Sequence, residues 1–346
     1  MPRSTESPAP GPLPVREAWL ALRGEPALHS GWPVVDPHHH LWMRPGWPYD
    51  APDLLADIGH GHRVLATVFV QCRSFYLDTG PEELRPIGET AHAAAAAHRA
   101  LTAGASTRIC AGIVGHANLT LGERVRAVLE AHMHAGQGRF RGIRHSTAWD
   151  PDPEVANPEL GSVPQLLEDA RFRAGFAQLA SLGLSYDAWV YHPQIDEVSA
   201  LACAFPDTSI VLNHLGGPIG IGRFADRRDE VFADWCRSIT ALAACDNVTV
   251  KLGGLAMRVS GQDLHLRALP PTSTELAQVL RPYVEAALEA FGPSRCMFES
   301  NFPVEKASCD YTVLWNAFKR LCEPLAESER DALLRGTASR VYRLGT

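Results

Sequence analysis

The chain has 346 residues, of which 46% are hydrophobic and 21% charged, and its formal net charge is −7. This composition is that of a globular protein with a sizeable core, and the acidic balance argues against a nucleic-acid partner. No apolar run approaches the ~20 residues that a membrane helix needs. Because the amino terminus also lacks the layout of a secretory signal, we expect a cytoplasmic protein without a membrane partner.

Residues 1–14 contain five prolines among Ser, Thr and Gly, a composition that predicts a disordered tail. We expect residues 15–346 to form one domain, in which β-rich runs that end in polar or glycine residues alternate with segments of helical spacing. The first expected strand ends in His38-His39-His40, and the others are 64–70, 109–114, 140–144, 188–192, 209–214, 248–252 and 296–302. The expected helices include 81–103, 164–182, 195–205, 228–244, 273–291 and 311–321.

Eight such β/α units predict an α/β fold with a parallel sheet, either closed as a (β/α)8 TIM barrel or open and doubly wound. Reactive side chains follow the first, fourth, fifth, sixth and eighth strands, and a closed barrel would bring all of these strand ends to one mouth. Glycines 216, 217, 220 and 222 follow a strand, but their spacing is not GxGxxG. We therefore favour the barrel and reject a dinucleotide site.

Four histidines at three strand ends form a candidate metal site. His38 and His40 project to the same face of their strand, while His39 points away. His192 and His214 end the fifth and sixth predicted strands. Neutral imidazole is the commonest zinc ligand, and catalytic sites typically use three protein ligands. His192 could instead bond backbone and His214 could serve a turn, but the joint pattern favours a shared site.

Six segments carry a resemblance to a known family: Asp36 to Trp42 (DPHHHLW), Arg139 to His145 (RFRGIRH), Tyr191 to Gln194 (YHPQ), Asn213 to Pro218 (NHLGGP), Val250 to Gly254 (VKLGG) and Arg295 to Val304 (RCMFESNFPV). In this order they resemble the amidohydrolase-related family 2 barrels, the predicted metal-dependent TIM-barrel hydrolases. That family includes sugar lactonases and 2-pyrone-4,6-dicarboxylate lactonase. The resemblance spans roughly residues 33 to 344.

The resemblance implies roles for particular residues. His38, His40, His192 and His214 match the family's histidines, and Arg144 matches an arginine that binds substrate carboxylate. A guanidinium pairs a carboxylate through two hydrogen bonds, which supports that role independently, although a salt bridge at the barrel rim is the alternative.

Further polar and aromatic residues near strand ends are candidates for lining the pocket or for satisfying loop backbone. Trp42 lies in a loop expected over the barrel mouth, where it would contact substrate or pack against neighbouring loops. The polar candidates are His116, His145, Gln194 and Gln71.

The eighth strand departs from the family pattern. Members usually end it in Gly-Ser-Asp, whereas this chain has Glu299-Ser300-Asn301. An amide does not accept a proton near neutral pH and is a poor ligand, so Asn301 cannot inherit the role of the aspartate. We expect Glu299 to supply the missing carboxylate, as base or as a ligand through water. The alternative is an ion pair between Glu299 and Lys251 inside the barrel.

The sequence therefore predicts a metal-dependent hydrolase of the amidohydrolase type that opens a lactone or related cyclic ester of a small carboxylate-bearing substrate. A divalent ion, with zinc as the first candidate, would polarise water or the carbonyl. His214 would orient or protonate, and Glu299 would receive the proton. A metal-free lactonase, a metal-dependent decarboxylase and a non-catalytic ligand-binding barrel remain alternatives, and a homo-oligomer is possible.

Overall fold

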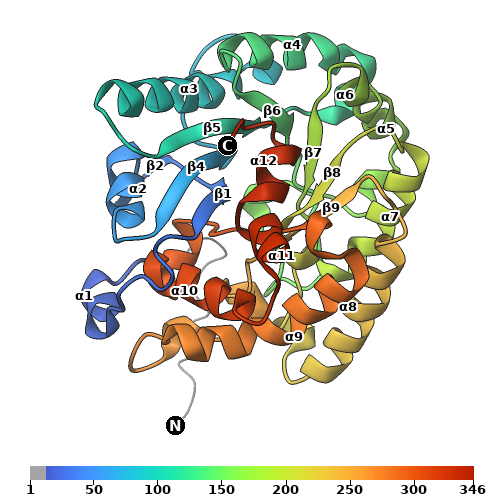
Figure 1. Ribbon diagram of the computed structural model, residues 1–346. Coiled ribbons are helices and arrows are strands. Elements are labelled where there is room, and N and C mark those ends of the chain that lie inside the picture. Colours follow the sequence, from blue (N-terminus) through green and yellow to red (C-terminus); the bar gives the residue numbers. More distant parts are fainter. Residues whose placement is uncertain (1–12) are drawn as a thin grey trace.

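The computed structural model describes residues 13–346, so the predicted tail lies outside the described residues except for Leu13 and Pro14. Eight parallel strands form one sheet in the order β1-β4-β5-β6-β7-β8-β9-β10. The last strand returns to the first, since the backbone nitrogen of His40 donates to Phe302 O at 2.7 Å and Asn301 N donates to His38 O at 2.9 Å. The sheet is therefore a barrel, as predicted (Figure 1).

The barrel strands are β1 (Pro33–His39), β4 (Arg63–Val70), β5 (Arg108–Gly115), β6 (Phe140–Ile143), β7 (Ser185–Ala188), β8 (Ile210–Leu212), β9 (Val248–Leu252) and β10 (Cys296–Phe298). A separate antiparallel hairpin consists of β2 (Trp42–Arg44) and β3 (Trp47–Tyr49). The helices are α1 (Glu17–Leu20), α2 (Ala51–Ile58), α3 (Ile87–Thr102), α4 (Val125–Ala135), α5 (Ala170–Phe176), α6 (Gln178–Ser181), α7 (Ile195–Ala204), α8 (Arg228–Leu242), α9 (Ser273–Phe291), α10 (Tyr311–Cys322), α11 (Glu327–Asp331) and α12 (Thr337–Val341).

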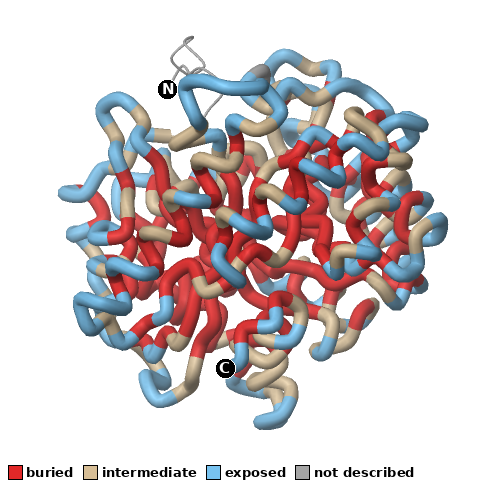
Figure 2. The backbone as a smooth tube through the Cα atoms, turned by 90° about the horizontal axis from the view of Figure 1, so that it is seen from above, coloured by how far each residue is buried: buried red, intermediate tan, exposed pale blue. Residues whose placement is uncertain are grey.

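The main core lies between the strands and the surrounding helices. Helix α3 shows how the sequence builds this layer: its alanines are strong helix formers, and Ala93, Ala94, Ala96, Ala97 and Ala100 are buried. Their small side chains allow the helix to pack closely on β5, one of its principal contacts. Figure 2 shows the result, with buried chain concentrated inside and exposed segments at the periphery.

A second, smaller core fills the inside of the barrel. It combines small strand residues such as Val35 and Val211 with residues from the end of the chain, including Tyr342 and Leu344. Helix α12 lies across one opening of the barrel in Figure 1, and the completely buried Tyr342 follows it. The Tyr342 hydroxyl donates to Asp187 Oδ2 at 2.8 Å, so this part of the chain closes the barrel from the amino-terminal side of the strands.

The predicted fifth strand is displaced: β7 covers Ser185–Ala188 rather than 188–192, so only Ala188 is shared. β8 ends at Leu212 and β10 at Phe298, two and four residues earlier than predicted. Beyond these two strands His214 and Asn301 have φ values of 54° and 53°, in the left-handed region, which a strand does not contain. Polar residues at these strand ends therefore reach the site from turns rather than from regular strands.

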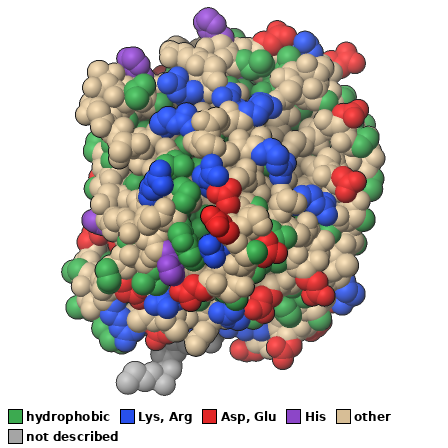
Figure 3. All heavy atoms as spheres, viewed as in Figure 1, with side chains coloured by type: hydrophobic (Ala, Val, Ile, Leu, Met, Phe, Trp, Pro, Cys, Tyr) green, Lys and Arg blue, Asp and Glu red, His purple; other side chains and the backbone are tan. Residues whose placement is uncertain are grey.

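The outer surface carries both signs of charge, and acidic and basic side chains are visible on the face shown in Figure 3. Within residues 13–346, no helix is long and apolar enough to span a bilayer.

Candidate active site

The centre of the site is the carboxylate of Glu299, which lies between two histidines. Glu299 Oε2 is 2.7 Å from Nδ1 of His38, and Glu299 Oε1 is 2.7 Å from Nδ1 of His214. The backbone nitrogen of His214 also donates to Oε1 at 2.8 Å. All three side chains are buried, with exposed fractions of at most 3%. The structure thus unites residues that are more than 250 positions apart at the carboxyl ends of three strands.

Two glycines after β9 make this close approach possible. A Cβ on Gly253 would lie 2.6 Å from Cγ of Glu299, and one on Gly254 would lie 2.4 Å from Cβ of His214. Gly254 also has a φ of 81°, which side chains other than glycine rarely adopt. The Gly-Gly pair of the predicted motif therefore packs directly against the two residues at the centre of the site.

Burial keeps the imidazoles of the site neutral. It lowers the pKa of His38 well below its ordinary value, and the cation of Lys251 adds to this effect. Burial also lowers the pKa of His214, against the opposing influence of the Glu299 carboxylate. A neutral imidazole has a free lone pair, so both histidines are in the form needed for a ligand or a base.

Lys251 pairs with Asp187 rather than with Glu299. Its Nζ lies 2.7 Å from Asp187 Oδ2, and both side chains are completely buried. The same Nζ is 3.3 Å from Nδ1 of His38. The ion pair therefore lies next to His38 at the inner side of the site, and the carboxylate of Glu299 faces the two histidines.

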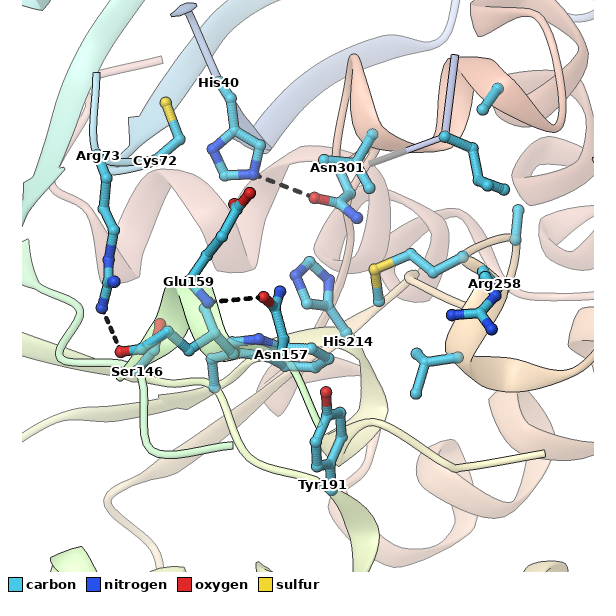
Figure 4. Close-up of a pocket in the computed structure, with 18 of the residues that line it drawn as sticks. His40, Cys72, Arg73, Ser146, Asn157, Glu159, Tyr191, His214, Arg258 and Asn301 are labelled. Atoms are coloured by element: carbon cyan, nitrogen blue, oxygen red, sulfur yellow. Dashed lines mark hydrogen bonds between the residues drawn. The ribbon is translucent and has the colours of Figure 1, made fainter. Parts of the chain in front are cut away.

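The second histidine of the HxH pair contacts the residue that departs from the family pattern. His40 Nε2 is 3.2 Å from Asn301 Oδ1, and His40 Nδ1 is 2.8 Å from the carbonyl oxygen of Val70 (Figure 4). Its ring lies 5.0 Å from that of His38. His39 points elsewhere, with Nε2 2.8 Å from Thr67 Oγ1. The alternation predicted for this strand is thus observed. Since a neutral His40 carries one N–H, it donates from Nδ1 to Val70 O, and the lone pair of Nε2 faces the side-chain amide of Asn301.

Three predicted site residues lie outside this centre. His192 accepts a hydrogen bond at Nδ1 from Ile219 N at 3.2 Å, and burial lowers its pKa to about 4. Gln194 accepts from Trp149 N at 2.9 Å and donates to Thr147 O at 2.9 Å. These contacts follow from the early end of β7, because the chain turns away from the barrel axis before it reaches His192.

His145 is the third of these residues. Its Nδ1 accepts from Leu119 N at 3.2 Å, and its ring packs against Phe172. The neighbouring residue Ser146 faces the cavity instead. Arg144 and Ser146 line the cavity and His145 between them does not, so side chains continue to alternate beyond the end of β6 and His145 falls on the opposite face.

A cavity of about 190 Å³ adjoins the site. Five residues singled out from the sequence line it: His40, His214, Asn301, Arg144 and Trp42. Figure 4 labels the first three of them. Arg144 is 7% exposed, and its Nη1 lies 3.3 Å from His38 Nε2. The indole of Trp42 donates to Trp47 O at 2.9 Å, so this ring both packs within its hairpin and borders the cavity.

Several lining residues escaped the sequence reasoning. Trp189 and Tyr191 border the cavity, and the Trp189 ring lies 4.8 Å from that of His214. Their alternate positions in Trp189-Val190-Tyr191 place both side chains on one face, and this spacing was the signal in the sequence. Gln71 was a weaker candidate, and it also lines the cavity.

The central residues fit a divalent metal ion in their chemistry. The candidate ligand atoms of His38, His214 and Glu299 all lie within 4.8 Å of one another. Although Glu299 Oε2 is close to His38, it makes no hydrogen bond, which leaves its lone pairs available. Ligand atoms about 2.1 Å from one zinc ion stand roughly 3.4 Å apart, so the two contacts of 2.7 Å would have to lengthen slightly.

A closed parallel barrel with buried histidines, a carboxylate and a cavity at the carboxyl ends of its strands defines a (β/α)8 barrel of the enzyme type. A model of the amidohydrolase family matches residues 35–344, and the chain belongs to that family.

Named relatives agree with this membership. The protein y4mH of Sinorhizobium fredii is 32% identical over 336 residues, covering 90% of this chain and 98% of its own. An L-fucono-1,5-lactonase of Burkholderia multivorans is 30% identical over 322 residues, covering 90% of this chain and 96% of its own. A crystal structure of an amidohydrolase from Burkholderia multivorans with bound zinc has 27% identity and a TM-score of 0.68, covering 90% of this chain and 99% of that one.

Proposed function

We propose that this protein hydrolyses a lactone or related cyclic ester of a small carboxylate-bearing substrate. The observation that carries the proposal is the buried contact of Glu299 with His38 and His214 beside a cavity lined by Arg144. Membership of the amidohydrolase family and the likeness to an L-fucono-1,5-lactonase support it.

The residues of the site divide the work as follows. Arg144 holds a carboxylate or lactone oxygen through its guanidinium, which is suited to planar anions. Glu299 receives the proton of the attacking water, and its hydrogen bonds to His214 hold it in place. His214, neutral and 3% exposed, orients the reacting groups, and the proton that Glu299 takes from the water is the one that returns to the leaving oxygen.

His38, His214 and Glu299 are the residues that would hold a divalent ion, with zinc as the first candidate. When bound, the ion would supply Lewis-acid polarisation of the water or the scissile carbonyl. His40 and His192 were predicted as further ligands. Ligation through Nε2 of His40 would replace its contact with Asn301 and keep the Nδ1 bond to Val70 O, whereas His192 accepts a bond from Ile219 N and does not line the cavity. A zinc-bound structure among the similar proteins supports the choice of metal.

A metal-independent lactonase is the second candidate, and one observation favours it. Two cationic side chains lie against His38: Arg144 Nη1 is 3.3 Å from its Nε2, and Lys251 Nζ is 3.3 Å from its Nδ1. Cations at this distance oppose the binding of a divalent ion, but they stabilise a developing oxyanion. Arg144 and the neighbouring histidines would then act as donors to that oxygen.

Elemental analysis of the purified protein, combined with a lactone panel assayed before and after chelation, tests both candidates. Stoichiometric zinc together with chelator-sensitive turnover supports the metal-dependent hydrolase. Turnover that survives complete metal removal supports the metal-free one. Failure to hydrolyse any lactone, with or without added zinc, manganese or magnesium, would contradict the proposal.

A further inference from the structure

The inner end of the cavity carries buried polar atoms that no described residue satisfies. Arg144 Nε, Ser146 Oγ and Gln71 Oε1 all lack a hydrogen-bond partner, and each belongs to a residue that is at most 7% exposed. All three residues line the cavity. Because unpaired buried polar groups cost free energy, such a cluster indicates that a ligand completes it. The guanidinium and the hydroxyl can both donate, which suits the oxygens of an acid or a lactone.

Another part of the cavity lining, here called the apolar wall, has a different character. Val155, Ile221, Met257 and Val259 line it together with Trp189 and Tyr191. These side chains form one hydrophobic cluster at this end of the barrel, separate from the cores that hold the fold. They come from the loops after β6, β7, β8 and β9, so four loops together build an apolar surface. Aliphatic side chains cannot form hydrogen bonds with hydroxyl groups, and burying hydroxyls against them is unfavourable.

Polar groups at the rim are largely occupied by one another. Arg44 Nη1 lies 3.3 Å from Glu159 Oε2, and Asn157 Oδ1 accepts from Glu159 N at 3.1 Å. Arg73 donates to the carbonyl oxygen of Leu160. Two further charged residues at the rim face solvent: Glu154 is exposed, and Arg258 is partly exposed. The rim therefore offers few fixed partners to a ring bearing many hydroxyl groups.

From this division we infer that the substrate is an amphipathic lactone, whose acid and carbonyl oxygens occupy the inner end and whose alkyl or aryl body lies on the apolar wall. A polyhydroxylated sugar lactone would leave its hydroxyls against Met257 and Val259. This inference rests on the proposed lactonase function and narrows its substrate class. It also separates this chain from the relative named for a sugar lactone, despite their shared barrel.

The experiment compares two series of lactone carboxylic acids with the same ring size, one bearing alkyl or aryl substituents and one bearing hydroxyls at the same positions. We expect kcat/KM to favour the alkyl or aryl series by at least tenfold, and to rise about fourfold per methylene until the wall is covered. Met257→Gln should reduce this preference about tenfold. Leu266→Gln is the matched control, because Leu266 is 70% exposed and does not line the cavity.

A preference for the hydroxylated series, or an unchanged preference in Met257→Gln, would overturn the inference while leaving the lactonase function intact. A binding assay tests the inference without turnover. Because Trp42 and Trp189 border the cavity, a bound ligand should change the tryptophan fluorescence of the protein. If no lactone is hydrolysed, the proposed function fails, and the ring-opened hydroxy acids still test the pocket. Tighter binding of the alkyl or aryl acids supports the inference, and equal or weaker binding overturns it.

Discussion

Glu299 Oε1 accepts two hydrogen bonds from one residue, the backbone nitrogen of His214 at 2.8 Å and its Nδ1 at 2.7 Å. The carboxylate is therefore held against His214, which lines the cavity, and Lys251 pairs with Asp187 instead. The two bonds make a glutamine substitution informative. The amide oxygen of Gln could still accept the backbone bond and so preserve the structure, but it could not take a proton.

We therefore expect Glu299→Gln to lower kcat by 10²- to 10⁴-fold, the usual range for loss of general base catalysis. The melting temperature should change little, as measured by circular dichroism. Glu305→Gln is the matched control: Glu305 is also buried, burial raises its pKa well above the ordinary value, and an amide oxygen can still accept the bond from Ala256 N. Full activity of the Glu299→Gln protein would exclude a proton-accepting role.

Arg144→Met should raise KM for a lactone carboxylate by about 10- to 100-fold, the equivalent of one charge-assisted hydrogen bond or somewhat more. The same variant should have a much smaller effect on a lactone of equal size without a carboxylate, because the lost interaction is specific for the anion. Steady-state kinetics on both substrates measures the difference. Arg126→Met, which removes an exposed arginine paired with Glu130, is the control. Equal losses on both substrates would contradict carboxylate recognition.

Lys251→Met should destabilise the protein by about 3–5 kcal/mol, because it leaves the Asp187 carboxylate buried without its cation. Urea unfolding measures the free energy. The double variant Lys251→Met/Asp187→Asn should recover much of the loss, since the amide can keep a hydrogen bond with Tyr342 without a buried charge. A double variant less stable than the single one would show that the ion pair itself, rather than the stranded charge, determines stability.

Glu89 should make stability depend on pH. It is 1% exposed, and burial raises its pKa to about 7 from an ordinary value of 4.5, although Cys72 N and Ser74 N donate to it. Between these values the folded state keeps a proton that the unfolded state has released. The free energy of unfolding should therefore fall by up to about 1.4 kcal/mol per pH unit as the pH rises from 4.5 to 7, and then level off.

Glu89→Gln should remove this slope while retaining the acceptor for the loop that carries Cys72. Urea unfolding at pH 5, 6 and 7.5 for both proteins provides the comparison, and the stability of the variant relative to the parent should increase with pH. Parallel pH profiles for the two proteins would show that Glu89 does not titrate in this range.

The barrel could be predicted because each β/α unit carries a local signal of strand run, polar end and amphipathic helix. The same signals placed His38, His214, Glu299 and Arg144 at one mouth. Strand ends were harder to place. In Ser185 to His192 the apolar run continues beyond the strand, so hydrophobicity did not reveal that β7 ends at Ala188.

The ion-pair partner of Lys251 could not be predicted from the local sequence pattern either. Asp187 lies in a strand of ordinary composition, and its position opposite Lys251 depends on β8 lying between β7 and β9. Which of the carboxylates of Asp187 and Glu299 pairs with Lys251 depends on the register of their strands along the barrel axis, and the sequence does not give that register. Similarly, the left-handed backbone at His214 and Asn301 depends on the contacts of the folded loops. Asn and His adopt this conformation more often than most residues, but too rarely for the residue type alone to predict it.

The hydroxyl of Tyr342 has a consequence for how the protein is made. Asp187, synthesised about halfway along the polypeptide, acquires this hydrogen bond only after Tyr342 has been translated, more than 150 residues later. Until then the interior of the barrel is not filled by Tyr342, and the Asp187 carboxylate lacks the hydrogen bond from the Tyr342 hydroxyl. A ribosome-bound chain that stalls before Tyr342 should consequently remain sensitive to proteases even when all eight strands have emerged.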